Sequence, residues 1–192
     1  MSRRNSRMRN MKKLLLSLVV SVSLIACNIN TQTKKTEAVN DKEAGSFTSM
    51  DDKSATVKKA IEAYMSNDTI YPHAELADTF KVYDMMSDNI ENGKVKANLV
   101  GKQAFINGSK MEHFLYSDIK MTTNNIKTFV FNDGRTVSGY WGYWSGTGNF
   151  TKATVTTPVH LIYWWERDKI VSMSRFFDPS QLKVEIAASQ KK

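Results

Sequence analysis

The segment PVHLIYWWERDKIVSMSRFFDP, residues 158–179, constrains the fold of this chain more than any other stretch. It contains two runs rich in β-branched and aromatic residues on either side of the polar pair Arg167-Asp168, a pattern typical of a β-hairpin. If this pair forms a two-residue turn, residues whose numbers sum to 335 face each other, which places His160 opposite Arg175. Both faces of the hairpin are largely apolar, so the rest of the fold must cover it from two sides.

Side chains alternate between two faces along a strand, so the turn position also predicts which residues share a face. One face should carry His160, Ile162, Trp164, Val171, Met173, Arg175 and Phe177. The other should carry Val159, Leu161, Tyr163, Trp165, Ile170 and Phe176, together with Ser172 and Ser174. A shift of one residue in the pairing would exchange the faces of one strand, so this prediction depends on the register.

The chain before this hairpin shows helical and strand patterns in turn. Residues 54–68 have apolar side chains at helical spacing, a short helix is predicted at 72–80, and residues 101–118 have a partial helical period. Residues 80–86 are expected to form a strand. Its even positions share one face: Phe80, Val82, Asp84 and Met86.

From residue 126 onward the pattern is mainly β. Asn132-Asp133-Gly134 lies between two β-rich runs, which indicates a further hairpin. Helices followed by a run of antiparallel strands predict an α+β fold with helices on one face of a curved sheet. Residues 54–182, about 130 residues, are the size of one domain.

The first 26 residues resemble a bacterial lipoprotein signal peptide. A basic segment precedes 13 uncharged residues, Leu14 to Ala26, and then Cys27, the only cysteine of the chain. Such an apolar run is roughly 20 Å long as a helix, short of the roughly 30 Å hydrocarbon core, so it is not expected to span a membrane. The sequence LIAC is similar to the lipoprotein signal box, in which the cysteine becomes the lipidated first residue. The alternative is a buried cysteine that follows an apolar run.

Lipidation of Cys27 would anchor the protein outside the cytoplasm, and Asn28 favours the outer membrane of a Gram-negative host. Residues 27–53 then combine the lipidated cysteine with a polar, flexible tether, and residues 183–192 are expected to be a polar tail. The formal charge is +8, but without the six basic residues of the signal peptide 21 basic residues face 19 acidic ones. Nucleic acid is therefore not expected as a partner.

Three stretches of the mature chain resemble the nuclear transport factor 2-like superfamily, which includes the SnoaL-like polyketide cyclases and the ketosteroid isomerases. They are AIEAYMSND, LADTFKVYD and WWERDKIVSMSRFFD, in the family's order over residues 54–182. The resemblance implies a cystatin-like cone, in which a strongly bent antiparallel sheet wraps around N-terminal helices and leaves a pocket. Isomerases, cyclases, dehydratases and proteins without known activity share this fold, so it does not select a function.

The resemblance also implies roles for three residues. The family's isomerases place their catalytic aspartate base at the end of a segment like ADTFKVYD, which corresponds to Asp84; the alternative is an aspartate bonded to a neighbouring turn. His160 corresponds to a protonated aspartate that donates a hydrogen bond to the substrate oxygen, and this departure argues against a steroid-type isomerisation. Tyr64 is the nearest match to the tyrosine of that oxyanion site.

In the family, the hairpin face with the positions of His160, Met173 and Phe177 lines the pocket, and the predicted register adds Arg175. Two basic groups and one acid at an apolar pocket suggest a ligand with an anionic or carbonyl oxygen, because arginine can bind a carboxylate through two hydrogen bonds. The alternative is an internal ion pair between Asp84 and Arg175, with His160 bonded to a backbone carbonyl.

The aromatic cluster GYWGYWSG, residues 139–146, is interpreted as a packed or dimer-forming sheet face, with a carbohydrate or base-stacking platform as the alternative. The sequence contains no phosphate loop, nucleophile elbow or zinc pattern, so neither a metal nor a cofactor is expected. Three functions remain open: a module that binds a small apolar ligand, an enzyme of the isomerase, cyclase or dehydratase type, and a protein-interaction domain. Ligand binding is preferred because the base is present while the family's oxyanion pair is incomplete.

Overall fold

The computed structural model describes residues 41–68, 74–85, 90–122 and 125–191. The chain forms two units, Met1–Val39 and Asn40–Lys192, and the described residues all lie in the second. The predicted signal peptide and Cys27 lie outside the described residues. Among the helices of the described part, none is long and apolar enough to cross a membrane.

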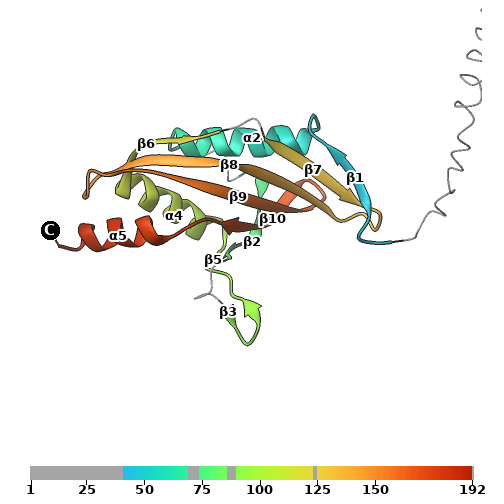
Figure 1. The fold of residues 1–192 in the computed structure, drawn as a ribbon. Coiled ribbons are helices and arrows are strands. Elements are labelled where there is room, and N and C mark those ends of the chain that lie inside the picture. The colour runs from blue at the N-terminus through green and yellow to red at the C-terminus, as the bar shows by residue number, and fades with distance from the viewer. Residues whose placement is uncertain (1–40, 69–73, 86–89, 123–124, 192) are drawn as a thin grey trace, which may run out of the picture. The chain divides into compact units, whose positions relative to one another are not determined.

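The second unit contains one large sheet, a small two-stranded ribbon and three described helices (Figure 1). The helices are α2 (Asp52–Met65), α4 (Lys102–Leu115) and α5 (Ser180–Ser189). The strands of the large sheet are β1 (Gly45–Thr48), β2 (Leu76–Asp84), β5 (Leu99–Val100), β6 (Tyr116–Met121), β7 (Ile126–Phe131), β8 (Thr136–Gly148), β9 (Thr154–Glu166) and β10 (Lys169–Phe176). The ribbon pairs β3 (Ile90–Glu91) with β4 (Lys94–Val95).

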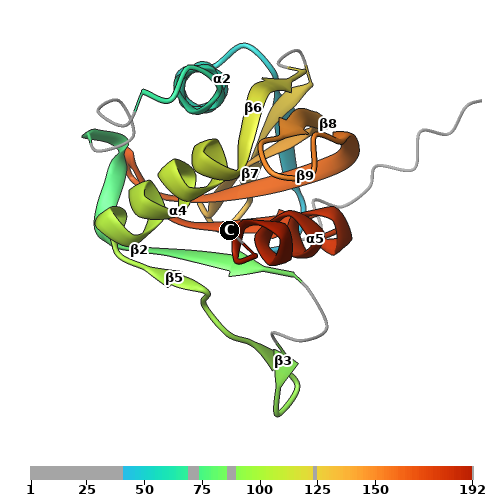
Figure 2. The same cartoon turned by 90° about the vertical axis from the view of Figure 1, so that its left-hand side faces the viewer.

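The large sheet bends around its helices. Its order is β1-β7-β8-β9-β10-β2-β5, and β6 also pairs with β8. Figure 2 shows α2 and α4 on the inner side of the bend. The predicted α+β fold with a bent sheet around helices is confirmed, with the difference that the sheet is mixed, because β10 and β2 run parallel.

Helix α2 is fixed to the sheet at its first turn. Asp51 caps the helix by accepting a hydrogen bond from the Ser54 backbone N–H at 2.7 Å, and the same Oδ1 accepts one from the Thr128 hydroxyl on β7 at 3.0 Å. Val57 and Ile61 then point into the core and are almost fully buried. The helix predicted from residue 54 is therefore present and begins slightly earlier.

The sequence predicts a short helix at 72–80, but from Leu76 onward the structure contains strand β2 instead. Its side chains alternate, and Phe80, Val82 and Asp84 are buried on one face, as the sequence predicts. This period of two, together with pairing to β10 on one side and β5 on the other, outweighs the weak helical pattern.

Folded structure also extends into the predicted flexible tether and into the predicted polar tail. Strand β1 lies within the predicted tether and pairs with β7, and most of the predicted polar tail belongs to helix α5. Short strands and helices of this kind have little periodic signal of their own, and they form because the rest of the domain offers a sheet edge or a docking surface.

The two predicted hairpins are both present, but the second has a different register. Gly134 supports the first turn with a φ of 87°, which glycine adopts readily. At the second turn, Ile170 pairs with Trp165 as predicted, and then β10 shifts by one residue between Ile170 and Ser172. Beyond this shift, Arg175 pairs with Leu161 rather than with His160.

The shift in β10 is a β-bulge, and it reverses the face assignment for the residues that follow. The extra residue is Val171, and the pairing of β10 with β2 shifts at the same place. Met173 and Arg175 therefore share a face with Leu161 and Tyr163, and the predicted grouping of Arg175 with His160 is wrong.

Candidate functional site

A mostly apolar cavity lies between the inner face of the sheet and helices α2, α4 and α5. Its volume is about 160 Å³, close to the roughly 150 Å³ of an apolar cavity that accommodates benzene. Aromatic and aliphatic side chains from helices and strands make up most of the wall, including Ile61, Phe105, Tyr116, Trp144, Leu161, Tyr163 and Met173. We call this space the central cavity.

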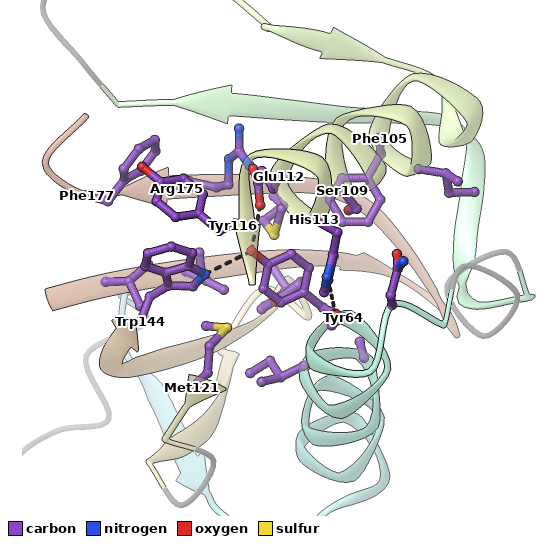
Figure 3. A pocket seen from close by; sticks show the side chains of 18 of the residues that line it. Tyr64, Phe105, Ser109, Glu112, His113, Tyr116, Met121, Trp144, Arg175 and Phe177 are labelled. Atoms are coloured by element: carbon purple, nitrogen blue, oxygen red, sulfur yellow. Dashed lines mark hydrogen bonds and ion pairs between the residues drawn. The ribbon is translucent and has the colours of Figure 1, made fainter. Parts of the chain in front are cut away.

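Arg175 on β10 joins two carboxylates, those of Asp84 and Glu112, and lies with Glu112 at one wall of the central cavity (Figure 3). It donates from Nε to Asp84 Oδ1 at 2.5 Å and from Nη2 to Asp84 Oδ2 at 3.0 Å, which makes a two-bond ion pair. Its Nη1 donates to Glu112 Oε1 on α4 at 3.0 Å. One guanidinium thus ties strand β2 and helix α4 to strand β10.

The network continues from Glu112 to the first helix. The Tyr64 hydroxyl donates to Glu112 Oε2 at 2.7 Å and accepts from Trp144 Nε1 at 2.9 Å (Figure 3). His113 Nε2 donates to the Tyr64 backbone carbonyl at 2.6 Å, so the end of α2 is also bonded to α4. We call the connected side chains of Asp84, Arg175, Glu112, Tyr64 and Trp144 the polar row.

The electrostatics of the polar row keep its donors protonated. Burial raises the pKa of Tyr64 well above its ordinary value, and the charge of Glu112 raises this pKa further. Burial alone would lower the pKa of Arg175, but Glu112 and Asp84 raise it above its ordinary value. Two acidic side chains face one guanidinium, so the formal charge of the row is negative.

Four of the predicted site residues line the central cavity: Tyr64, Met173, Arg175 and Phe177. Asp84 is buried and contacts Arg175, but the cavity wall formed by the described residues does not include it. Its backbone N–H donates to Asn98 Oδ1 at 2.6 Å. The ion pair between Asp84 and Arg175 that the sequence offers as an alternative is therefore present.

His160 lies on the opposite, outer face of the sheet, because it alternates along β9 with Val159 and Leu161, which line the central cavity. Its ring is stacked between Trp141, at 4.7 Å between centroids, and Phe176, at 5.4 Å. These three rings lie in a shallow outer groove that also includes Asn125 and Asp178. The buried Nε2 of His160 has no hydrogen-bond partner among the described residues, and burial lowers the pKa of this histidine. The prediction that His160 lines the pocket is wrong.

Glu112, Trp144 and His113 are hydrogen-bonding cavity residues that the sequence prediction misses. Glu112 follows Phe105 by seven positions and Ser109 by three, so helical spacing places all three on one face of α4. That spacing could have identified Glu112. For Trp144 the sequence indicates only an aromatic cluster, because alternation along β8 does not show which face is inner.

The described residues contain no group of three or more His, Cys, Asp or Glu side chains arranged to hold a metal ion. The polar row and the aromatic wall supply hydrogen bonds, charge and apolar contact to the central cavity.

Comparison with known proteins identifies the fold. No protein-family model matches the chain, and no curated protein matches it by sequence. Among solved structures, PrhC from Penicillium brasilianum aligns with a TM-score of 0.55 and 12% identity, covering 71% of this chain and 88% of that one. A nuclear transport factor 2-like protein of unknown function from Burkholderia pseudomallei aligns with a TM-score of 0.54 and 18% identity, covering 72% of this chain and all of that one.

A candidate SnoaL-like polyketide cyclase from Jannaschia aligns with a TM-score of 0.52 and 12% identity, covering 70% of this chain and 90% of that one. At these identities the likeness concerns the fold and not the reaction. The chain has the SnoaL-like, nuclear transport factor 2-like cone fold, with its central cavity between the bent sheet and the helices.

Proposed function

We propose that this protein is a lipid-anchored, extracytoplasmic SnoaL-like domain that binds a small, mostly apolar molecule in its central cavity through a neutral oxygen. The observation that carries this proposal is the combination of an apolar wall with one polar row at which Arg175 and Tyr64 are exposed to the cavity. Sites for small molecules commonly combine an apolar lining with a few fixed polar groups.

The charges of the polar row favour a neutral oxygen over an anion. The three hydrogen bonds from Arg175 to Asp84 and Glu112 use three of the five N–H groups of a guanidinium, which leaves donor capacity at the cavity wall. The two acidic side chains outnumber this single cation, so an anionic ligand would meet net repulsion. A carbonyl or hydroxyl oxygen can accept a hydrogen bond without that penalty.

A series of three fluorinated probes tests this proposal. We expect 4-fluorophenol to bind more tightly than fluorobenzene, which lacks the oxygen, and far more tightly than 4-fluorobenzoate, which is an anion. Titration followed by ¹⁹F NMR measures all three affinities. Tighter binding of 4-fluorobenzoate would contradict the neutral-oxygen proposal.

A matched pair of variants locates the binding. Ser109 lines the central cavity from α4, so Ser109→Trp should fill the cavity and abolish binding of 4-fluorophenol. Lys110→Trp adds the same ring at the next, exposed position and should leave binding unchanged. Equal binding by the two variants would place the probe elsewhere.

The lipid anchor rests on the sequence around Cys27 and is tested separately. Cys27→Ser should move the protein from the membrane fraction to the soluble fraction, because acyl chains can no longer be attached. Unchanged fractionation would exclude lipidation as the anchor, and would leave the ligand-binding proposal unaffected.

A second candidate function is proton transfer, with Glu112 as the base in place of Asp84. Glu112 lines the central cavity, where its two oxygens accept from Arg175 and Tyr64, whereas Asp84 lies behind Arg175 and is not among the described residues of the cavity wall. Ligand recovered with the purified protein and identified by native mass spectrometry would be incubated with it in D₂O. Deuterium uptake that Glu112→Gln abolishes would support an enzyme; no uptake would favour a binding module.

A homodimer through the outer face of the sheet is a third candidate, because Trp141 and Tyr143 on β8 are 41% and 59% exposed. Sedimentation of the wild type and of the Tyr143→Ser variant tests it. A dimer that dissociates on this substitution would support an interaction role, and a monomeric wild type would exclude it.

A further inference from the structure

Helix α5 forms part of the wall of the central cavity although it is attached to the domain by few side chains. Gln181 and Leu182 line the cavity. Leu182 packs against the small apolar cluster of Leu115, Tyr116 and Ile119. Further along the helix, Val184 and Ile186 are exposed to solvent, so the apolar attachment is centred on Leu182.

The second attachment of α5 is the carboxylate of Glu185, which is 1% exposed. One oxygen accepts from the Phe150 backbone N–H at 2.6 Å, and the other accepts from the Thr151 backbone N–H at 3.2 Å and from its hydroxyl at 2.5 Å. Both residues lie in the turn between β8 and β9, which is next to α5 in Figure 1. Leu182 and Glu185 are three positions apart, so they share one helix face.

The turn that contacts Glu185 has room for its carboxylate and is hydrogen-bonded to helix α4. A Cβ atom at Gly148 would lie 2.4 Å from Glu185 Oε2, so glycine leaves the space that the carboxylate occupies. The neighbouring Asn149 bonds to the end of α4, through its N–H to the Leu115 carbonyl at 2.8 Å and through Nδ2 to the Phe114 carbonyl at 2.8 Å. The turn is therefore fixed to α4, and α5 is held to the turn by Glu185.

We infer that helix α5 is the movable wall through which ligands enter and leave the central cavity, with Glu185 as the latch that holds it closed. A helix of ten residues is marginal alone, so α5 depends on its contacts with the domain, among them those of Leu182 and Glu185. Hydrogen bonds to a buried carboxylate hold the helix in one position, and they are lost together when the helix moves away. The role in ligand entry rests on the proposed function, whereas the latch itself does not.

Hydrogen exchange of the purified full-length chain, followed by mass spectrometry, measures the latch. In Glu185→Gln the side chain keeps its size but loses its charge, and its amide group meets N–H donors. Exchange in α5 and in the β8–β9 turn should therefore rise by about 10- to 100-fold, with β9 and β10 unchanged. Val184→Ala, at the exposed neighbouring position, is the control and should exchange like the wild type. Equal exchange in the two variants would overturn the inference.

Ligand exchange measured by ¹⁹F NMR with 4-fluorophenol tests the entry role. In Glu185→Gln the association and dissociation rates should rise together, by about the same factor as the exchange of α5, while the affinity changes by less than about threefold. Faster opening of α5 with unchanged ligand rates would overturn the entry role.

Two further outcomes separate the inference from the proposed function. If 4-fluorophenol fails to bind the wild type, the proposed function and the entry role both fail, and the exchange result still decides the latch. If Glu185→Gln fails to fold, Thr151→Val gives a weaker version, because it removes one of the three hydrogen bonds and keeps the two backbone donors. Unchanged α5 exchange in Thr151→Val would then overturn the latch.

Discussion

Strands β9 and β10 present two faces with opposite treatment of their polar groups. On the inner face, Arg175 has its charge matched by Asp84 and Glu112, and the side chains around it line the central cavity. On the outer face, His160 is stacked between two rings and its Nε2 has no partner among the described residues. On the inner face, two carboxylates compensate the charge of Arg175. On the outer face, burial lowers the pKa of His160 and so favours its neutral form.

The difference between the faces depends on one residue, Val171. Without the bulge at this position, Arg175 and His160 would point to the same side, as the turn at Arg167-Asp168 predicts. With it, the arginine faces the cavity and reaches two carboxylates from other elements, while His160 faces the other side of the sheet. The consequence for function is direct: the cavity has one cationic group already neutralised rather than two available for an anion.

The largest expected effect is the loss of the inner charge network. Arg175→Leu removes the cation that pairs with the buried Asp84 and the half-buried Glu112, which should lower the free energy of unfolding by about 3–5 kcal/mol. Urea denaturation at neutral pH measures it. The double variant Asp84→Asn with Arg175→Leu also removes one of the two carboxylates that have lost their cation. It should therefore recover part of the lost stability.

His160→Leu serves as the outer-face control for this experiment. This substitution removes a side chain from the same pair of strands as Arg175, but it breaks no hydrogen bond that the described residues make. The free energy of unfolding should therefore fall by much less than in Arg175→Leu. If Arg175→Leu leaves both stability and 4-fluorophenol affinity unchanged, the inward assignment of Arg175 is wrong.

The sequence predicts the architecture better than the site, for a physical reason. Helix and strand patterns are local, so the first helix, both hairpins and the buried face of Phe80, Val82 and Asp84 follow from periodicity. A bulge has no comparable pattern, and it is favoured here by simultaneous pairing of β10 with β9 and β2.

The polar row was only partly predictable for the same reason. Its members come from α2, α4, β2, β8 and β10, and their contacts depend on how these elements pack. Tyr64, Asp84 and Arg175 were recognised as individual residues, while Glu112, which connects them, was not. The pairing of Asp84 with Arg175 could be offered only as an alternative until the register was known.

A smaller effect is expected at the far end of the polar row. Tyr64→Phe removes the hydroxyl that donates to Glu112 and accepts from Trp144, and leaves both groups without this partner in a buried setting. The expected cost is about 1–3 kcal/mol, with weaker binding of 4-fluorophenol. Chemical denaturation and ¹⁹F titration measure the two effects. A neutral result in both would show that water replaces the hydroxyl.

On the outer face, Trp141→Ala should cost less than Tyr64→Phe. The ring is 41% exposed and stacks on His160 at an angle of 22° between the ring planes, a contact of about 0.5–1.5 kcal/mol. Denaturation of the two variants under identical conditions gives the comparison. A larger loss for Trp141→Ala would mean that the outer face contributes more to stability than the polar row.

The smallest expected effect is a pH dependence that belongs to His160 alone. Burial lowers the pKa of His160 in the folded protein, so the unfolded chain binds more protons as the pH falls below about 6.5. Stability should therefore decrease from pH 7 towards pH 5 in the wild type, and His160→Phe, which retains a ring between Trp141 and Phe176, should remove this part of the slope.

Asp178, the acidic residue of the outer groove, is ionised across this range and acts on both proteins alike. For Asp51 and Glu185, hydrogen bonds outweigh the effect of burial and lower the pKa. Their protonation therefore destabilises the fold only at lower pH, and it does so equally in the wild type and in the variant. Urea denaturation at intervals between pH 5 and pH 7 isolates the contribution of His160 from that of the carboxylates, which titrate at lower pH. Identical slopes for wild type and variant would show that His160 is not buried as a neutral ring.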